Sequence, residues 1–157
     1  MSLIYTALAG RIQESLDELH LLVQRIDRYI DKALQSDEQA YWDAVALNLH
    51  GFYSGVERIF EDIARTVDAS IPAGSEWHVD LLIQMAAGMN DIRPPVISRE
   101  TRICLDEYRG FRHVVRNIYT FNLRPSRIKE LAQDLPSCYE SIVHDLSAFT
   151  AFLEKLN

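Results

Sequence analysis

Basic side chains gather in one stretch of an otherwise acidic chain. Between residues 99 and 129 there are eight Lys and Arg residues and three carboxylates, so this window carries +5. The rest of the chain has eight bases and twenty acids, or −12, which together give the net charge of −7. A protein with this balance is a poor general nucleic-acid binder. Any phosphate chemistry must be local, or must come from pairing two such windows.

Four residues of that window have spacings suited to one side of a helix: Arg109, Arg112, Arg116 and Tyr119. Residues seven apart lie nearly in line on a helix, so Arg112 and Tyr119 share a stripe, with the other two arginines beside it. A fixed guanidinium fork next to a phenol can hold a phosphate group. The alternative is structural: the arginines pair with carboxylates on neighbouring helices, and the tyrosine caps the core.

Helices are the elements that would position these residues. Apolar side chains recur every three or four positions over 4–33, 41–67, 99–119 and 126–153, the pattern of amphipathic helices. The short apolar segment 78–89 predicts one more helix, either the most buried segment or part of a subunit interface. The sequence has neither strand-like alternation nor a Gly-rich phosphate loop. We therefore expect an all-α fold, a single antiparallel bundle of four to five helices over residues 1–157.

Two features mark the first helical hairpin. Ser36 and Gln39 have the spacing of a capping box, which predicts the start of the second helix. Gly51 and Gly55 lie inside that helix, where each costs about 1 kcal/mol relative to alanine. They indicate close approach of another helix or, alternatively, contact with a ligand or partner chain.

Prolines divide the second half of the chain. Pro94-Pro95 cannot continue a helix and predicts a stiff connector, after which Ser98 is a candidate N-cap. Pro136 lies inside the last helical pattern, so we expect it to kink that helix or divide it in two.

Cysteine and histidine spacing gives no sign of a metal site. Cys104 and Cys138 lie far apart without a CxxC pair, which predicts two buried thiols in a reducing compartment and no disulfide. The five histidines are scattered without metal-ligand spacing, so we expect no metal and no other cofactor. Acids and Gln interrupt the first residues before any long apolar run, so we expect no signal peptide, no membrane span and a cytoplasmic location.

The segment YRGFRHVVRNIY at 108–119 resembles the signature of HepT-like ribonucleases of the HEPN superfamily. The likeness covers most of the chain, including HGFYSGVERIFEDIA at 50–64, EWHVDLL at 76–82 and RPP at 93–95. It implies a small helical bundle that cleaves RNA without a metal and forms the toxin half of a toxin–antitoxin pair. The antitoxin would be a minimal nucleotidyltransferase.

The family's motif is an Arg, four residues, a His, one residue and a Tyr. Arg112 and Tyr119 match it, whereas Asn117 occupies the His position. In the family, the Arg and His support attack of the ribose 2′-hydroxyl on the adjacent phosphate. A carboxamide cannot relay a proton, and losing a general acid–base costs about 10²–10⁴ in rate, so Asn117 predicts impaired cleavage. The resemblance also makes Tyr119 the residue to which the nucleotidyltransferase would attach adenylate.

Helix geometry constrains how these residues can meet. Arg112 and position 117 are about 140° apart on a continuous helix, so the family's arrangement requires a break near Asn117 or residues supplied across a dimer. His113 directly follows Arg112 and points about 100° away. This direction favours a structural or dimer-cleft histidine over a replacement base.

Three functional hypotheses follow. The first is a homodimeric endoribonuclease toxin in which two basic windows, about +10 together, face an RNA cleft. Arg112 would hold the scissile phosphate, and Arg109 and Arg116 would bind RNA. The second is a catalytically silent binding or regulatory subunit that partners a minimal nucleotidyltransferase, which the missing His favours. A third is a helical homodimer whose arginines only make salt bridges.

Overall fold

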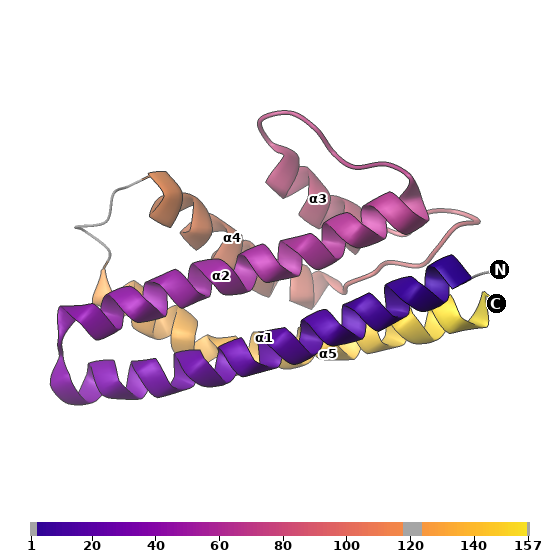
Figure 1. The fold of residues 1–157 in the computed structure, drawn as a ribbon. Helices are drawn as coiled ribbons and strands as arrows, with labels where there is room; N and C mark the ends of the chain where they lie inside the picture. The colour runs from indigo at the N-terminus through magenta and orange to yellow at the C-terminus, as the bar shows by residue number, and fades with distance from the viewer. Residues whose placement is uncertain (1–2, 118–123, 157) are drawn as a thin grey trace.

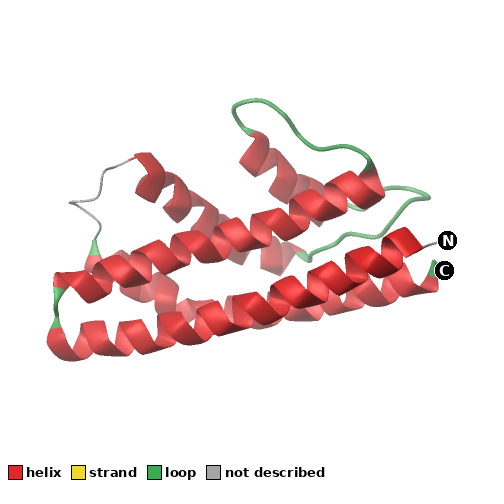
Figure 2. Ribbon diagram, in the orientation of Figure 1, coloured by secondary structure: helices red, strands yellow, loops and turns green. Residues whose placement is uncertain are grey.

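A computed structural model of the protein describes residues 3–117 and 124–156, apart from the side chains at 114, 116 and 117. Its elements in chain order are α1 (Leu3–Ser36), α2 (Gln39–Ile63), the π-helical turn η1 (Ala64–Asp68), α3 (Trp77–Ala86), α4 (Arg99–Asn117) and α5 (Pro125–Lys155) (Figure 1). The predicted all-α bundle is confirmed, and the described residues form no β-strand (Figure 2). None of the helices in these ranges has the length and apolar character needed to cross a bilayer.

The long helices α1, α2 and α5 form the body of the bundle, and α3 and α4 pack on it. α1 contacts α2 and α5, whereas α4 contacts α2, α3 and α5. The two ends of the chain lie at the same end of the bundle (Figure 1). α2 is therefore the central element: α1 packs on one side of it, and α3 and α4 pack on another.

The core follows the predicted periodicity. α1 buries one residue in every three or four along its whole length, at Leu8, Ile12, Leu16, Leu19, Val23, Ile26, Ile30 and Ala33. α2 buries a wider set of side chains because it contacts α1, α3, α4 and α5. α3 buries Leu81, Leu82 and Met85, but Ile83 is 50 % exposed, so α3 is not the most buried segment.

The predicted close approach at the second helix is confirmed at Gly55. A Cβ atom there would lie 2.8 Å from Leu19 Cδ2 of α1, so a larger residue would push against the neighbouring helix. A Cβ atom at Gly51 would lie 4.0 Å from Leu22 Cδ2, an ordinary van der Waals distance. Gly55 thus sets how closely α1 and α2 pack.

The predicted capping box is wrong. The Ser36 hydroxyl donates to Lys32 O at 2.7 Å and accepts the N–H of Glu38 at 3.3 Å, while Glu38 itself is the N-cap of α2. α1 continues through Ser36, so this hydroxyl is used at the end of α1 and does not cap α2.

The division of the last helix at Pro136 is also wrong, because α5 runs unbroken from Pro125 to Lys155. A proline inside a helix removes one backbone hydrogen bond and crowds the preceding turn. Here the ring is exposed, while Leu135 and Cys138 on either side are buried in the core. Packing of these neighbours offsets the local cost and keeps the helix continuous.

The prediction of two separate thiols is wrong as well. Cys104 of α4 and Cys138 of α5 form a disulfide with a Cα–Cα distance of 6.0 Å. The two helices run antiparallel from the connection at 118–124, and this arrangement brings the distant positions together. The bond borders an open cleft of about 420 Å³ between α4 and α5.

The start of α4 is fixed to α5. Ser98 Oγ accepts the N–H of Thr101 at 3.1 Å, which confirms Ser98 as the N-cap. The Asp145 carboxylate of α5 accepts the Ser98 N–H at 2.9 Å and the Thr101 hydroxyl at 2.5 Å. Burial raises the pKa of Asp145, but these hydrogen bonds outweigh it and hold the pKa below its ordinary value. These hydrogen bonds anchor the first turn of α4 to α5. Arg112, the motif arginine, follows Thr101 by eleven residues on the same helix.

Candidate functional site

Arg112 of α4 lies against α2. Its Nε donates a hydrogen bond to Ser54 Oγ at 3.1 Å, and its Nη1 lies 3.9 Å from Glu57 Oε1. The side chain is only 15 % exposed, so the guanidinium is held in a fixed orientation with one edge near the surface. A guanidinium has five N–H donors in a planar fork, so beside these two contacts it can also bind an anion such as phosphate.

Glu57 is the buried centre of the cluster. Its side chain is 4 % exposed although it carries a carboxylate. A buried carboxylate is costly unless charged or hydrogen-bonding groups surround it. One oxygen, Oε1, faces Arg112, and the other, Oε2, lies 2.5 Å from His78 Nδ1. The carboxylate therefore joins α2 to both α3 and α4.

His78 lies in the first turn of α3. The ring centroids of His78 and Trp77 are 3.6 Å apart, so the indole restrains the imidazole from one side. The His78 side chain is 23 % exposed, more than either Glu57 or Arg112. The imidazole is thus held by a buried carboxylate and still reaches solvent.

Tyr53 forms the inner wall of the cluster. It precedes Ser54 on α2 and is 1 % exposed. Burial raises the pKa of its phenol, and the nearby Glu57 carboxylate adds to this rise. The side chain therefore stays neutral next to the polar cluster.

The other predicted site residues have different placements. Arg109 donates to Asp106 of its own helix at 2.7 Å and is 25 % exposed. His113 is exposed. Arg116 and Asn117 lie in the last turn of the described part of α4, and nothing is described of their side chains. Tyr119 lies outside the described residues.

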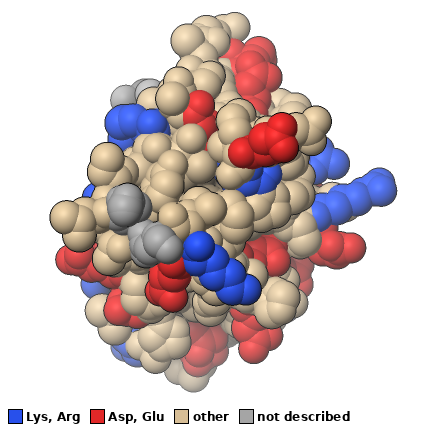
Figure 3. Space-filling view, turned by 90° about the vertical axis from the view of Figure 1, so that its right-hand side faces the viewer, with Lys and Arg blue, Asp and Glu red and all other residues tan. Residues whose placement is uncertain are grey.

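Ion pairs neutralise part of the basic window. Arg127 forms an ion pair with Glu107 of α4 and another, at 3.0 Å, with Glu130 of its own helix. Arg109 forms an ion pair with Asp106. At the end of the bundle that carries both chain termini, acidic and basic side chains are interspersed (Figure 3). Arg112 differs from these two arginines because the carboxylate that it faces, Glu57, is buried and also contacts His78.

Sequence reasoning missed Ser54, Glu57 and His78 as site residues. A signal for Glu57 was present, because it lies four residues after Tyr53 and three before Phe60, both buried. A carboxylate at such a position in an amphipathic helix indicates an internal partner. Nothing local points from Glu57 to His78, because their contact depends on how α3 packs.

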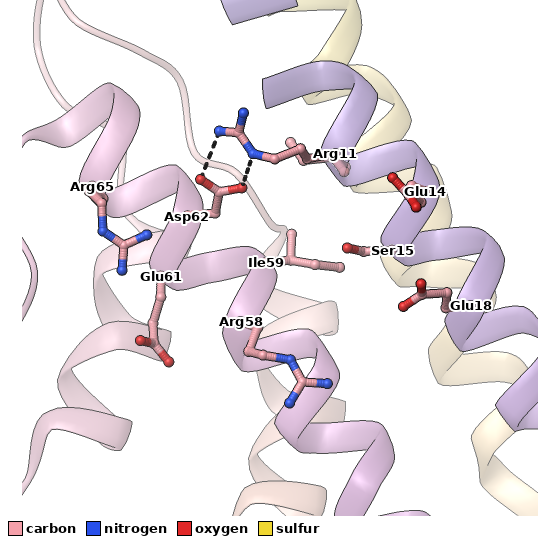
Figure 4. A pocket seen from close by; sticks show the side chains of 10 residues that line it. Arg11, Glu14, Ser15, Glu18, Arg58, Ile59, Glu61, Asp62 and Arg65 are labelled. Carbon is pink, nitrogen blue, oxygen red and sulfur yellow. Dashed lines mark hydrogen bonds and ion pairs between the residues drawn. The ribbon is translucent and has the colours of Figure 1, made fainter. Parts of the chain in front are cut away.

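A second groove lies on the α1 side of α2. It has a volume of about 590 Å³, and Arg11 closes one end by donating two hydrogen bonds to Asp62, at 2.8 and 2.9 Å (Figure 4). These hydrogen bonds lower the pKa of Asp62. Four carboxylates and three arginines line the groove: Glu14, Glu18, Glu61, Asp62, Arg11, Arg58 and Arg65. This balance disfavours a polyanion, so the groove is a poor candidate for RNA.

Within the described part of the chain, no group of three or more His, Cys, Asp or Glu side chains could hold a metal ion. The polar cluster at Arg112 has a different composition, with one carboxylate, one imidazole and one guanidinium. Such a set can bind an anion and move a proton.

Comparison with known proteins agrees with the family resemblance. The family model described as "HepT-like protein" matches residues 44–153, which include the whole cluster. Searches of curated proteins and of solved structures found no match. The matched range extends from the early part of α2 nearly to the end of α5, well over half of the chain. The chain belongs to the HepT-like family of the HEPN superfamily.

Proposed function

We propose that this protein is the toxin component of a toxin–antitoxin pair and cleaves RNA without a metal. The observation that carries the proposal is the position of Arg112. This arginine matches the family's motif, and its guanidinium is fixed between Ser54 and Glu57 with one edge near the surface. A guanidinium in this position can bind the scissile phosphate and stabilise charge that develops during attack by the 2′-hydroxyl.

The partner in this proposal is a minimal nucleotidyltransferase that silences the toxin by adding adenylate to Tyr119. The added phosphate would bring negative charge to a site that binds a phosphate, and so repel RNA. A reading frame for such an enzyme beside this one supports the pairing, and its absence from the neighbourhood counts against it.

Cleavage by the unmodified protein is the first test. With EDTA present, we expect it to cut single-stranded RNA and leave 2′,3′-cyclic phosphate and 5′-hydroxyl ends. Asn117→His is expected to cleave faster, by up to about 10²–10⁴, because it supplies an imidazole at the motif position. Gel analysis of end-labelled RNA measures both rates.

Asn117 also favours the second candidate function, a catalytically silent subunit that binds the nucleotidyltransferase. RNA left intact by the unmodified protein, together with cleavage by Asn117→His, would support this candidate and contradict the enzyme. Binding of a purified minimal nucleotidyltransferase would then be the activity to measure.

The proposal includes a homodimer formed through α3 and α4. A groove of about 380 Å³ lies between these helices, bordered by Ile83 and Ile103, which are 50 % and 53 % exposed. Arg102, Arg109, Asp106 and Glu107 also line the groove. In a two-fold dimer the same surface meets itself, so a patch with both charges around apolar side chains can be self-complementary. A second copy of the chain is the occupant that we propose.

Ile103→Glu is expected to convert the dimer to a monomer, because it places an unpaired charge in the apolar centre of the contact. Sedimentation velocity measures the change. Leu47→Glu is the matched control, since Leu47 is an equally apolar and 67 % exposed side chain of α2 outside this groove. A monomeric unmodified protein, or a dimeric Ile103→Glu variant, would contradict this interface.

A further inference from the structure

The contact between His78 and Glu57 determines which imidazole nitrogen is available for chemistry. A carboxylate accepts hydrogen bonds, so the 2.5 Å contact assigns the N–H to Nδ1 of His78. The neutral ring then carries its lone pair on Nε2. The Nδ1 edge faces the buried Glu57 carboxylate, so the 23 % of the side chain that is exposed belongs mainly to the rest of the ring, which includes Nε2.

Glu57 and Trp77 hold the ring in one orientation. The carboxylate is 4 % exposed and bonds Nδ1, while the indole lies 3.6 Å from the imidazole between centroids. Buried carboxylates that bond one nitrogen of a histidine fix its tautomer and stabilise the imidazolium that forms when the other nitrogen takes a proton. Glu57 is positioned to do both for His78.

The same carboxylate places the imidazole beside the phosphate-binding group. Glu57 Oε2 contacts His78 and Oε1 faces Arg112, so the imidazole and the guanidinium flank the two oxygens of one side chain. A phosphate bound by Arg112 on its α3-facing side would lie next to His78. His113 does not share this arrangement, because it is exposed and follows Arg112 on the helix, about 100° away.

We propose that Nε2 of His78 is the proton acceptor for the attacking 2′-hydroxyl. This inference rests on the ribonuclease function proposed above and explains how the chain can cleave RNA with Asn117 at the motif position. The 2′-hydroxyl proton passes to Nε2 as the bond from the 2′ oxygen to phosphorus forms. The bond from phosphorus to the 5′ oxygen breaks, and that oxygen takes a proton from solvent. The imidazolium then returns its proton to solvent, so no net proton is gained or lost.

The test compares RNA cleavage in EDTA by the full-length protein and two variants. His78→Asn retains an N–H close to the position of Nδ1, so it can still bond Glu57, but it cannot accept the proton. We expect the cleavage rate to fall by about 10²–10⁴ while the RNA dissociation constant stays unchanged. His78→Ala is expected to lose the same activity and to regain part of it when free imidazole fills the vacated space. Rescue of this kind separates proton transfer from a structural role.

His144→Asn is the matched control, because the His144 side chain is 86 % exposed on α5 and bonds only its neighbour Asp145 among the described residues. It should cleave RNA at the unmodified rate. Circular dichroism of all variants checks that α3 remains folded.

The outcomes separate this inference from the function on which it rests. Cleavage by the unmodified protein that persists in His78→Asn would overturn the role of His78 and leave the ribonuclease function standing. Loss of cleavage without imidazole rescue would also overturn it, in favour of a positioning role. An unmodified protein that leaves RNA intact, whether or not Asn117→His cleaves it, would overturn both.

Discussion

Replacing Arg93 by methionine is expected to lower the free energy of unfolding by about 3–5 kcal/mol. Arg93 and Asp68 form an ion pair in which both side chains are 0 % exposed. Nε and Nη2 of the arginine donate to the two carboxylate oxygens at 2.6 and 2.8 Å. The remaining N–H groups donate to backbone oxygens of residues 84, 87 and 94. Methionine fills a similar volume but leaves the Asp68 carboxylate buried with Gln84 as its one remaining side-chain partner among the residues that the structure describes.

Urea unfolding followed by circular dichroism measures this loss. Arg11→Met is the matched control, because it breaks an ion pair with Asp62 in which the arginine is 49 % exposed. Exposed pairs contribute about 0–1 kcal/mol, so this control should unfold nearly like the unmodified protein. Replacing both buried partners, Asp68→Leu with Arg93→Met, should restore part of the stability, since no charge is then left unpaired. A single Arg93→Met variant as stable as the control would contradict the argument.

This ion pair matters for the site because of what it connects. Asp68 ends the π-helical turn after α2, and Arg93 lies in the connector between α3 and α4. Its hydrogen bonds to backbone oxygens of residues 84 and 87 fix the end of α3. The other end of α3 carries His78, and the connector leads into α4, which carries Arg112. The pair therefore sets the relative placement of the three helices whose side chains meet at Glu57.

The sequence predicted the longer helices well because each of them has a long apolar periodicity. The span of α1 and the close packing at Gly55 followed from spacing and residue type alone. The capping box at Ser36 failed because α1 continues through Ser36, whose hydroxyl bonds the preceding turn of α1. Pro136 failed as a helix breaker for a related reason, since buried neighbours on both sides stabilise α5 through it. Tertiary packing overrode a local preference in both places.

The cysteine pair could have been predicted from topology. Cys104 and Cys138 lie 17 residues on either side of position 121, in the segment predicted to interrupt the helices. An antiparallel pair of helices around that point brings equidistant positions together. Their separation of 34 residues along the chain, taken alone, hides this symmetry. The contact of His78 with Glu57 had no such symmetry, because it depends on a long loop and a buried ion pair that the sequence does not reveal.

Arg112→Ala is expected to reduce RNA cleavage by about 10³-fold, equivalent to about 4 kcal/mol of transition-state stabilisation. The guanidinium lies 3.9 Å from the Glu57 carboxylate that also contacts His78, and it is only 15 % exposed, so little water screens its charge. Removing it takes away the group proposed to bind the scissile phosphate. Glu57 keeps its hydrogen bond to His78, so the bundle should remain folded.

Arg112→Lys separates charge from geometry. A lysine retains the positive charge but lacks the planar fork, which donates to Ser54 through Nε and in this proposal binds the phosphate through its other N–H groups. We expect it to recover RNA binding but little of the cleavage rate. Arg99→Ala provides the control, because it removes an exposed arginine at the opposite end of the same helix. Single-turnover cleavage at saturating RNA measures the three rates. Equal rates for Arg112→Ala and Arg99→Ala would mean that Arg112 has only a structural role and pairs with Glu57. That result would support the alternative in which the arginines of the basic window only form salt bridges.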